Sequence, residues 1–317
     1  MTHREAIGVD VGGTTIKLGI VREDGTVHGH HALPTEAERG PEGVLNRIAS
    51  GIGTLLATPH HSISGIGLGV PGVINNSGEV CYPPNFPGWE VVPVADRLRA
   101  ILGTELPIAV ENDANAAAFA EAHAGSGHGA ESFLYITLGT GVGGSIIHGG
   151  RIWRGETGGA GEVGHISVDL NGPACNCGSR GCVEAYVGQR YMTAIAAERL
   201  RKEAGSRLHP MIAHGAALSP ELIDQAADAG DEFSRRFLED MGDILGAALA
   251  SALNMLDFHL VIAGGGMAGS ARLLDAAHRS MRARVLRSIG HRAELRAARF
   301  GNDAGIIGAG LMMSYGC

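Results

Sequence analysis

A pattern that occurs twice constrains the fold of this chain more than any other feature. Each half opens with a strand-like segment, a turn rich in glycine and threonine, a second strand, a tight turn and a third strand. The pattern predicts duplicated α/β domains that face one another across a cleft, where small ligands bind. The expected strands of the two openings cover residues 5–11, 15–22 and 26–32, and residues 132–138, 142–148 and 150–154.

Strands and helices alternate after each opening, which excludes an all-β fold and a helical bundle. We expect a small N-terminal α/β domain of residues 1–113 plus 303–317 and a large C-terminal α/β domain of residues 114–302. Periodicity and turn residues predict further strands at 63–70, 107–111, 258–263 and 293–299. They predict helices at 41–57, 92–102, 113–123, 183–204, 219–229, 231–256 and 270–288, and from Asp303 onward.

Composition argues against several classes of protein. A net charge of −8 disfavours nucleic acid and anionic membrane surfaces as partners. Without a signal peptide or an uncharged apolar run of about 18 residues, we expect a cytoplasmic protein with no membrane span. The five cysteines are an odd number, with Cys81 and Cys317 apart from a cluster of three, and indicate metal binding rather than disulfides. The 50 glycines, over twice the usual share, indicate tight turns and close backbone approach.

Three glycine-rich segments have the chemistry of phosphate- or nucleotide-binding loops. Asp10–Lys17 offers backbone N–H groups, two threonine hydroxyls and a lysine, and Asp10 can hold Mg²⁺ through water. Leu138–Gly144 repeats this chemistry, and Ala263–Met267 suits the close approach of a base or a sugar. For Asp10–Lys17 the alternative is an ordinary hairpin with a glycine bulge, and any one segment alone is weak evidence because glycines also terminate strands. The three together predict a nucleotide site.

Two matches to G-x-G-x-x-G, at Gly67–Gly72 and Gly159–Gly164, do not indicate a dinucleotide site. That fingerprint requires a helix directly after the glycines. Pro71 and the turn after it exclude a helix in the first case, and the cysteine-rich loop excludes one in the second. The chain also lacks G-x-x-x-x-G-K-[ST], so it is not a P-loop enzyme.

Three adjacent polar residues, Glu111, Asn112 and Asp113, stand at the end of a buried strand. Asn112 or Asp113 could cap the helix that follows. The functional interpretation makes Asp113 a general base for a substrate hydroxyl during phosphoryl transfer, with Asn112 orienting the same substrate. The two interpretations are compatible, because both direct a side chain out of the carboxyl end of a strand.

A cysteine-rich turn predicts a structural metal. Cys175, Cys177 and Cys182 have C-x-C-x4-C spacing, and His165 is the natural fourth ligand of a Cys3His zinc site. Glu162 and Glu184 each lie within three residues of a proposed ligand, so the metal would fix both carboxylates in space. The alternative is a zinc loop that only holds the chain together.

These motifs resemble, in order and over essentially the whole chain, the ROK family of bacterial sugar kinases and repressors. The resemblance rests on Asp10–Lys17, Glu111–Ala118, Leu138–Gly144, Gly161–His165 and Cys175–Glu184. It implies an actin-like (ribonuclease H-like) two-domain hexokinase fold, with sugar and ATP in the cleft between the domains. The zinc would be structural, because four protein ligands leave it no open position.

The resemblance also assigns roles to individual residues. Asp113 matches the catalytic base, and His165 serves both the zinc and the sugar. The sugar-binding positions match Gly72, Asn85, Asn112, Asp113, Glu162, His165 and Glu184. The positions for ATP and Mg²⁺ match Asp10, Gly12, Gly13, Thr14, Thr15, Lys17, Gly139, Thr140, Gly141, Gly264, Gly265 and Gly266. The zinc ligands match His165, Cys175, Cys177 and Cys182.

The expected activity is ATP-dependent phosphorylation of the 6-hydroxyl of a hexose, with glucose as the first choice because the Pro84–Trp89 loop resembles that of family glucokinases. N-Acetylmannosamine and N-acetylglucosamine are the alternative substrates. A sugar-sensing repressor is disfavoured, because the first glycine segment begins within ten residues of Met1, and a binding protein without activity is disfavoured by the intact Asp113. We expect the protein to form a homodimer or a homotetramer. We also expect it to act in glycolysis.

Overall fold

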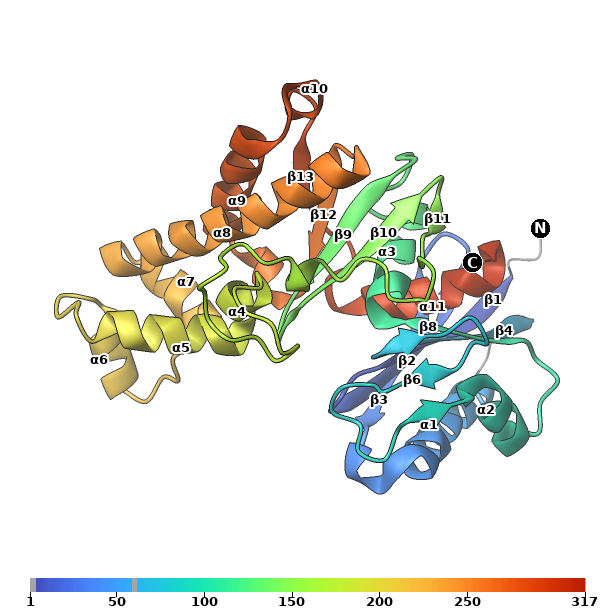
Figure 1. The fold of residues 1–317 in the computed structure, drawn as a ribbon. Helices are drawn as coiled ribbons and strands as arrows, with labels where there is room; N and C mark the ends of the chain where they lie inside the picture. Colours follow the sequence, from blue (N-terminus) through green and yellow to red (C-terminus); the bar gives the residue numbers. More distant parts are fainter. Residues whose placement is uncertain (1–3, 59–61, 317) are drawn as a thin grey trace. The chain divides into compact units, whose positions relative to one another are not determined.

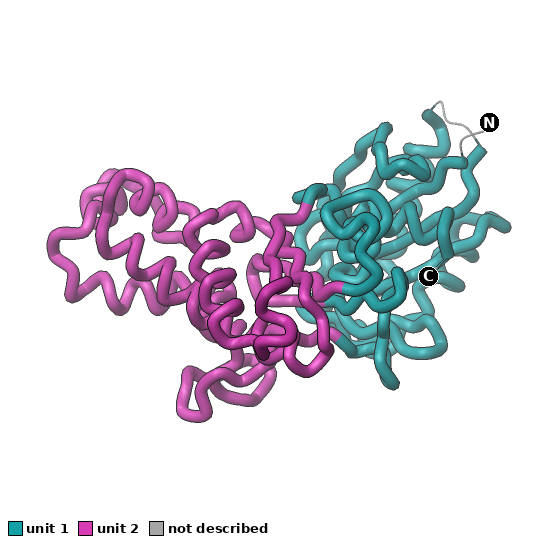
Figure 2. The backbone as a smooth tube through the Cα atoms, turned by 90° about the horizontal axis from the view of Figure 1, so that it is seen from above, with its two compact units in different colours: residues 1–132, 145–160, 299–317 teal, residues 133–144, 161–298 magenta. Residues whose placement is uncertain are grey.

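The computed structural model describes residues 4–58 and 62–316 (Figure 1), so Cys317 lies outside the described residues. The chain divides into two compact units (Figure 2). Unit 1 contains residues 1–132, 145–160 and 299–317, and unit 2 contains residues 133–144 and 161–298. This division differs from the expected boundary at residue 113, because the helix that begins there packs against the C-terminal helix in unit 1.

A five-stranded sheet forms the centre of unit 1, in the order β3-β2-β1-β4-β8. β1 and β2 form an antiparallel hairpin, while β1, β4 and β8 run parallel. The strands are β1 (Glu5–Val11), β2 (Thr15–Arg22), β3 (Val27–Pro34), β4 (Ile63–Val70) and β8 (Ile108–Asn112). The longer helices of this unit are α1 (Gly40–Leu56), α2 (Val94–Leu102), α3 (Asp113–Ala124) and α11 (Ala304–Tyr315).

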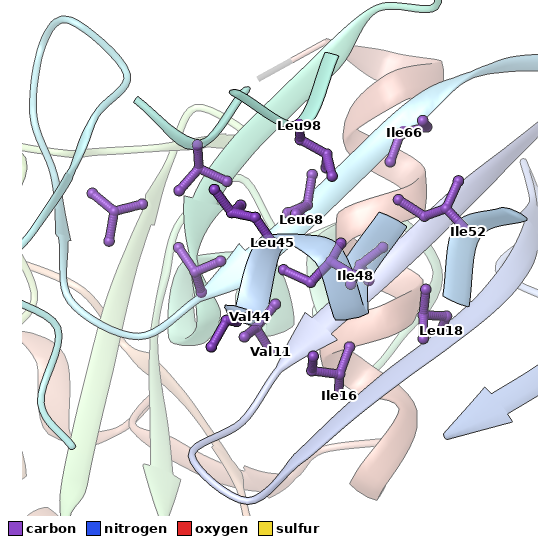
Figure 3. Packing of buried hydrophobic residues seen from close by; sticks show 14 of the residues in the cluster. Val11, Ile16, Leu18, Val44, Leu45, Ile48, Ile52, Ile66, Leu68 and Leu98 are labelled. Carbon is purple, nitrogen blue, oxygen red and sulfur yellow. The ribbon is translucent and has the colours of Figure 1, made fainter. Parts of the chain in front are cut away.

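Helices cover both faces of this sheet. Helix α1 contacts β1, β2 and β3, and its Val44, Leu45 and Ile48 pack into one apolar cluster with the strand residues Val11 and Leu68 (Figure 3). Helices α3 and α11 pack against each other and contact β4 and β8. Polar side chains at the strand ends are therefore held by a sheet with packed helices on both faces.

The second sheet repeats the first. Its order is β11-β10-β9-β12-β13. When the strands of each sheet are numbered by their order along the chain, both sheets have the order 3-2-1-4-5. β9, β12 and β13 run parallel, as the corresponding strands of the first sheet do. This order confirms the duplication predicted from the two openings. The strands are β9 (Phe133–Leu138), β10 (Val142–His148), β11 (Arg151–Ile152), β12 (Leu260–Gly264) and β13 (Glu294–Ala297).

The helices of unit 2 centre on the long helix α8, which packs along α9. No helix among the described residues has the length and apolar character needed to cross a membrane. The helices are α4 (Glu184–Val187), α5 (Gln189–Leu200), α6 (Leu208–Ala213), α7 (Pro220–Asp228), α8 (Glu232–Leu256), α9 (Ala271–Arg284) and α10 (Arg287–Gly290).

Several expected elements differ in detail. The helix expected at 183–204 breaks at Gly188, where ψ is 137°, into α4 and α5. A Cβ at Gly188 would lie 2.8 Å from the Glu184 carbonyl oxygen, so close backbone contact accompanies the break. The helix expected at 270–288 ends at Arg284, and the strand expected at 150–154 covers two residues. The loop of residues 71–93 contains five prolines and is called here the proline-rich loop. It contains a small sheet that was not predicted, formed by β5 (Val73–Ile74), β6 (Val80–Cys81) and β7 (Val91–Val92).

Glycine allows α11 to lie directly on the first sheet. A Cβ at Gly67 would be 1.8 Å from the Ala309 carbonyl oxygen, and one at Gly8 would be 2.0 Å from that of Ile306. Real Cβ atoms do not approach backbone oxygens so closely, so any side chain here would push the helix away. Part of the glycine excess therefore serves helix–sheet packing rather than turns.

We predict that Gly67→Ala lowers the free energy of unfolding by about 3 kcal/mol, the upper range for overpacking a core. Gly53→Ala is the matched control, because Gly53 is exposed within α1 and its Cβ would meet nothing within 4 Å. There the same methyl group should add about 0.5–1 kcal/mol of stability. Urea denaturation of both variants checks the prediction, and equal effects would contradict it.

Candidate functional site

Polar groups of unit 1 gather at the carboxyl ends of three neighbouring parallel strands. Asp10 near the end of β1 is in register with Gly69 of β4, and Val70 is in register with Asn112 at the end of β8. Gly72 follows β4 by two residues, and Asp113 opens α3. Ligands of open α/β sheets bind outside the carboxyl ends of the strands. The sheet therefore brings together residues that lie about 100 positions apart in sequence.

Asn112 is the N-cap of α3. Its Oδ1 accepts hydrogen bonds from the backbone N–H groups of Ala114 at 2.9 Å and Asn115 at 3.1 Å, and its Nδ2 donates to the Gly72 carbonyl at 3.0 Å. The capping interpretation is thus confirmed for Asn112. The neighbouring Asp113 accepts from the Ala114 N–H through Oδ1 at 2.8 Å. This contact fixes one oxygen of the carboxylate on the first turn of the helix.

The first glycine segment is the β1–β2 hairpin, and its amides are used unequally. The Gly12 N–H donates to the Thr15 carbonyl at 3.0 Å, so this amide closes the hairpin. Gly13 and Thr14 are exposed at the tip, and their N–H groups have no partner within residues 4–58 and 62–316. An anion can therefore be met by these two amides rather than by Gly12.

Thr35, which the sequence analysis did not single out, braces this hairpin. Its hydroxyl donates to the Gly12 carbonyl at 2.6 Å, and its N–H donates to the Thr14 carbonyl at 2.9 Å. The side chain is fully buried. It directly follows Pro34, which pairs with Thr15 in the structure, and this pairing places it beside the hairpin.

Asp10 lies in a concentrated acidic environment. Burial is the main cause that raises its pKa from 3.8 to about 6, and the nearby Asp113 and Asp303 carboxylates raise it further, while Lys17 opposes them. A Cβ at Gly305 would lie 2.7 Å from Asp10 Cγ, so the carboxyl group packs against the start of α11. Three carboxylates near one lysine are a suitable oxygen donor set for Mg²⁺ carried with a nucleotide.

The proline-rich loop brings Asn85 close to the hairpin. Asn85 has a positive φ of 66°, and its Cβ lies 3.9 Å from the position that a Cβ on Gly13 would take. Phe86 and Trp89 anchor the loop through an edge-to-face contact of 5.3 Å between ring centroids, and both side chains are buried. Left-handed backbone at a non-glycine residue often marks a functional position.

The four expected zinc ligands of unit 2 come together. The ligand atoms of His165, Cys175, Cys177 and Cys182 all lie within 4.8 Å of one another. His165 Nδ1 is 3.8 Å from Cys175 Sγ, and the sulfurs of Cys177 and Cys182 are 3.6 Å apart. Tetrahedral zinc with Zn–S distances of about 2.3 Å places neighbouring ligand atoms about 3.8 Å apart. The donor set of this Cys3His cluster therefore fits one structural zinc.

The Cys3His cluster lies beside the carboxylates expected to bind sugar. His165 directs Nδ1 toward Cys175, which leaves Nε2 on the other side of the ring, 3.9 Å from Glu162 Oε2. Glu184 Oε1 lies 3.9 Å from Cys175 Sγ. The imidazole can thus serve a metal with one nitrogen and a hydroxyl with the other.

Glu184 also holds the second glycine segment. Its Oε2 accepts the N–H of Val142 at 2.9 Å, and a Cβ at Gly141 would lie 2.3 Å from this oxygen. The Gln189 N–H donates to the Gly139 carbonyl at 3.0 Å. The segment after the cysteines therefore supports the loop expected to bind phosphate, a connection that the sequence analysis missed.

The third glycine segment packs beside the second. Gly264 of β12 is in register with Thr137 of β9, and a Cβ at Gly265, whose φ is 84°, would lie 2.4 Å from the Leu138 carbonyl oxygen. Gly266 has open space instead, and it lines a pocket of about 180 Å³. The other lining residues include Met192, Glu221, Asp224, Gln225, Leu238, Met267 and Ser270.

Known proteins resemble this chain over nearly its full length. The family model described as "ROK family" matches residues 6–315. A glucokinase from Halalkalibacterium halodurans is 38% identical over 99% of this chain and 96% of its own length. An N-acetylmannosamine kinase from Escherichia coli O157:H7 is 28% identical over 96% of this chain and 97% of its own.

Among solved structures, a ROK family glucokinase from Streptomyces griseus in complex with glucose and AMPPNP superposes with a TM-score of 0.82. It is 32% identical and covers 96% of this chain and 97% of its own. The expected actin-like hexokinase fold is confirmed by this likeness together with the duplicated sheets.

The raised pKa of Asp10 predicts a pH-dependent cost to stability. Because the folded protein keeps this proton up to about pH 6 and the unfolded chain releases it near 3.8, stability falls as pH rises through that window. Asp10→Asn should raise the free energy of unfolding by up to about 3 kcal/mol at pH 7.5 and have little effect at pH 3.5. Denaturation in EDTA at both pH values measures this.

Asp24→Asn is the control with the opposite sign. Hydrogen bonds from Thr26 lower the pKa of Asp24, so its carboxylate stabilises the folded state above the unfolded pKa and this contribution is lost as pH falls. That variant should be less stable than wild type at pH 7.5, and the difference should shrink in acid. The same sign for both variants at pH 7.5 would contradict our description of Asp10.

Proposed function

Because the chain belongs to the ROK family, we propose that it is an ATP-dependent sugar kinase that transfers the γ-phosphoryl group to the 6-hydroxyl of a hexose. The observation that carries this proposal is the position of Asp113. It stands on the first turn of α3, at the carboxyl ends of three parallel strands, in the same unit as the β1–β2 hairpin.

Asp113 takes the proton from the reacting hydroxyl as that oxygen bonds to the γ-phosphorus. The bond from this phosphorus to the β–γ bridging oxygen breaks, and ADP leaves. Its Oδ1 is held by the Ala114 N–H, which restrains the carboxylate at the start of α3. The N–H groups of Gly13 and Thr14 and the loop Gly139–Gly141 receive phosphate oxygens. Asp10 would hold Mg²⁺ carried with the nucleotide, and the cation would supply neutralisation of the charge on the transferred group.

In unit 2, we assign His165 Nε2, Glu162 and Glu184 to sugar hydroxyls. In unit 1, Asn112, Gly72 and Asn85 are the sugar-binding residues that the family resemblance assigns. Zinc on the Cys3His cluster supplies no Lewis-acid chemistry, because four protein ligands complete its coordination. Its contribution is to orient His165 and Glu184. Adenosine occupies the pocket at Gly266, where Asp224 and Gln225 offer polar groups for the ribose or the base.

We propose glucose as the preferred acceptor, since the more similar relative named above is a glucokinase. N-Acetylmannosamine is the second candidate, because a kinase for that sugar also aligns over nearly the whole chain. A coupled assay over hexoses and N-acetylhexosamines, at fixed ATP, decides between them through the ratio of kcat/KM values. If sugars bind but none is phosphorylated, a sugar-sensing or binding role replaces the kinase proposal.

We further propose that the enzyme works in the cytoplasm at the entry to glycolysis, as a homodimer or homotetramer. Light scattering coupled to size-exclusion chromatography gives the oligomeric state directly.

Asp113→Asn should lower kcat by roughly 10²–10⁴, which is the usual contribution of a positioned base. Sugar affinity should stay near that of wild type, because the amide keeps the shape of the side chain. Asp96→Asn, on the exposed surface of α2, is the control. Steady-state kinetics and calorimetric sugar titration test both. A near-normal kcat in Asp113→Asn would remove Asp113 from the mechanism.

Cys177→Ala should yield a folded protein without zinc, because Cys177 is exposed and only the loop depends on the metal. Sugar binding should be lost, since His165 and Glu184 lose their orientation. Nucleotide affinity should also fall, by a smaller factor, because Glu184 holds the Val142 N–H. Cys81→Ser, outside the cluster, should retain the metal.

Elemental analysis and separate titrations with glucose and a nonhydrolysable ATP analogue measure these three quantities. Full sugar affinity in zinc-free Cys177→Ala would show that the metal is only a scaffold. Unchanged nucleotide affinity would show that the contact between Glu184 and Val142 does not maintain the second glycine segment.

A further inference from the structure

Glu111 is a carboxylate that the proposed mechanism does not use, although it lies two residues before Asp113. Its side chain is 1% exposed. A buried charge is costly unless it is paired and fully hydrogen-bonded. The structure shows how this requirement is met.

The Glu111 carboxylate has four polar contacts, two at each oxygen, of which three are hydrogen bonds and one is an ion-pair contact. Oε1 accepts the backbone N–H of Asn112 at 2.8 Å and the side-chain amide of Asn115 at 2.9 Å. Oε2 accepts Nε of Arg154 at 2.8 Å and one of its terminal nitrogens at 2.5 Å. An ionised carboxylate has about four acceptor positions, so its capacity is filled.

Arg154 reaches Glu111 from 43 residues away in the sequence, just beyond the short strand β11. Its own carbonyl accepts the Ala160 N–H at 3.1 Å, which closes the loop 154–160. Asn76 donates to the Glu156 carbonyl at 3.2 Å, and a Cβ at Gly158 would lie 2.1 Å from the Ile74 carbonyl oxygen. Arg154 therefore belongs to a loop that is fixed to unit 1 at several points.

We propose that Arg154 is a positioning residue for phosphoryl transfer. It holds Glu111, which in turn holds Asn112 and Asn115, and these three residues set the first turn of α3 that carries Asp113. The proposal rests on the kinase activity proposed above. It assigns Arg154 to the chemical step, because the restraint acts on the orientation of the base rather than on the hairpin that meets ATP.

Stability alone does not account for the pair. A buried ion pair is often no more stabilising than apolar residues of similar volume. A positioning role requires the charge and the forked geometry of arginine, because Nε and a terminal nitrogen both meet one oxygen. The two explanations predict different kinetics, since a structural role changes the amount of folded enzyme and a positioning role changes kcat per folded molecule.

The test compares Arg154→Met, Arg154→Lys and the double variant Glu111→Gln/Arg154→Met with wild type. Arg151→Met is the matched control, because Arg151 is an exposed arginine in the adjacent strand β11. kcat and both KM values are measured per folded molecule, counted by binding of a nonhydrolysable ATP analogue. Hydrogen exchange of the peptide covering residues 108–119 is followed in the same samples.

We expect Arg154→Met to lower kcat by about 10–100-fold, a fraction of the effect of removing the base itself, with the KM for ATP within about twofold of wild type. Arg154→Lys should recover part of kcat. The double variant should have a higher kcat than Arg154→Met, because it leaves no unpaired charge beside Asn112. Exchange should accelerate at the start of α3 in Arg154→Met and stay unchanged in Arg151→Met.

A kcat per folded molecule within about twofold of wild type in Arg154→Met, with only a lower Tm, would overturn the proposal. If Arg154→Met folds poorly, Arg154→Lys serves instead. Hydrogen exchange and kcat equal to those of wild type in Arg154→Lys would equally overturn the positioning proposal. Absence of sugar phosphorylation in wild type would instead reject the proposed function, and the exchange data on residues 108–119 would still test the restraint on α3.

Discussion

Contact between backbones without an intervening side chain is the constraint on which this structure depends. Helix α11 lies on the first sheet at Gly8 and Gly67, where any Cβ would meet a helix carbonyl at 2.0 Å or less. In unit 2, Gly265 lies against Leu138, and Gly188 lies against Glu184 and Thr140. Glycine thus determines both the packing within each unit and the close approach of the loops that we assign to the nucleotide.

Two carboxylates near Asp113, those of Glu111 and Asp10, have opposite electrostatic environments. Glu111 is neutralised by Arg154 and fully hydrogen-bonded, so it serves as a fixed anchor. Asp10 is only partly exposed, and desolvation together with two nearby carboxylates, opposed by Lys17, raises its pKa to about 6. A group that is costly to ionise in the free protein gains most from a cation that arrives with the substrate. This contrast supports an anchoring role for Glu111 and a cation-facing role for Asp10.

The Cys3His cluster is connected to the second glycine segment as well as to the residues that we assign to the sugar. Glu184 places one oxygen toward Cys175 and the other on the Val142 N–H, and the following Gln189 holds Gly139. A disturbance of the cluster would therefore extend to a loop more than 30 residues earlier in the sequence. The structural zinc that we propose would stabilise the arrangement of both substrates in unit 2.

The duplicated three-strand openings, the Cys3His set and the polar residues at the ends of β1 and β8 could all be predicted from the sequence. These features follow from local spacing, from periodicity and from the chemistry of single residues. The partners of individual groups became known only from the folded structure. The Gly12 amide closes its own hairpin, Asn112 caps α3, and α3 belongs to unit 1. The hydrogen bonds from Arg154 to Glu111 and from the Val142 N–H to Glu184 were also seen only in the structure. Such contacts depend on how sheets and helices pack, because nothing in the spacing of two distant residues records the distance between them.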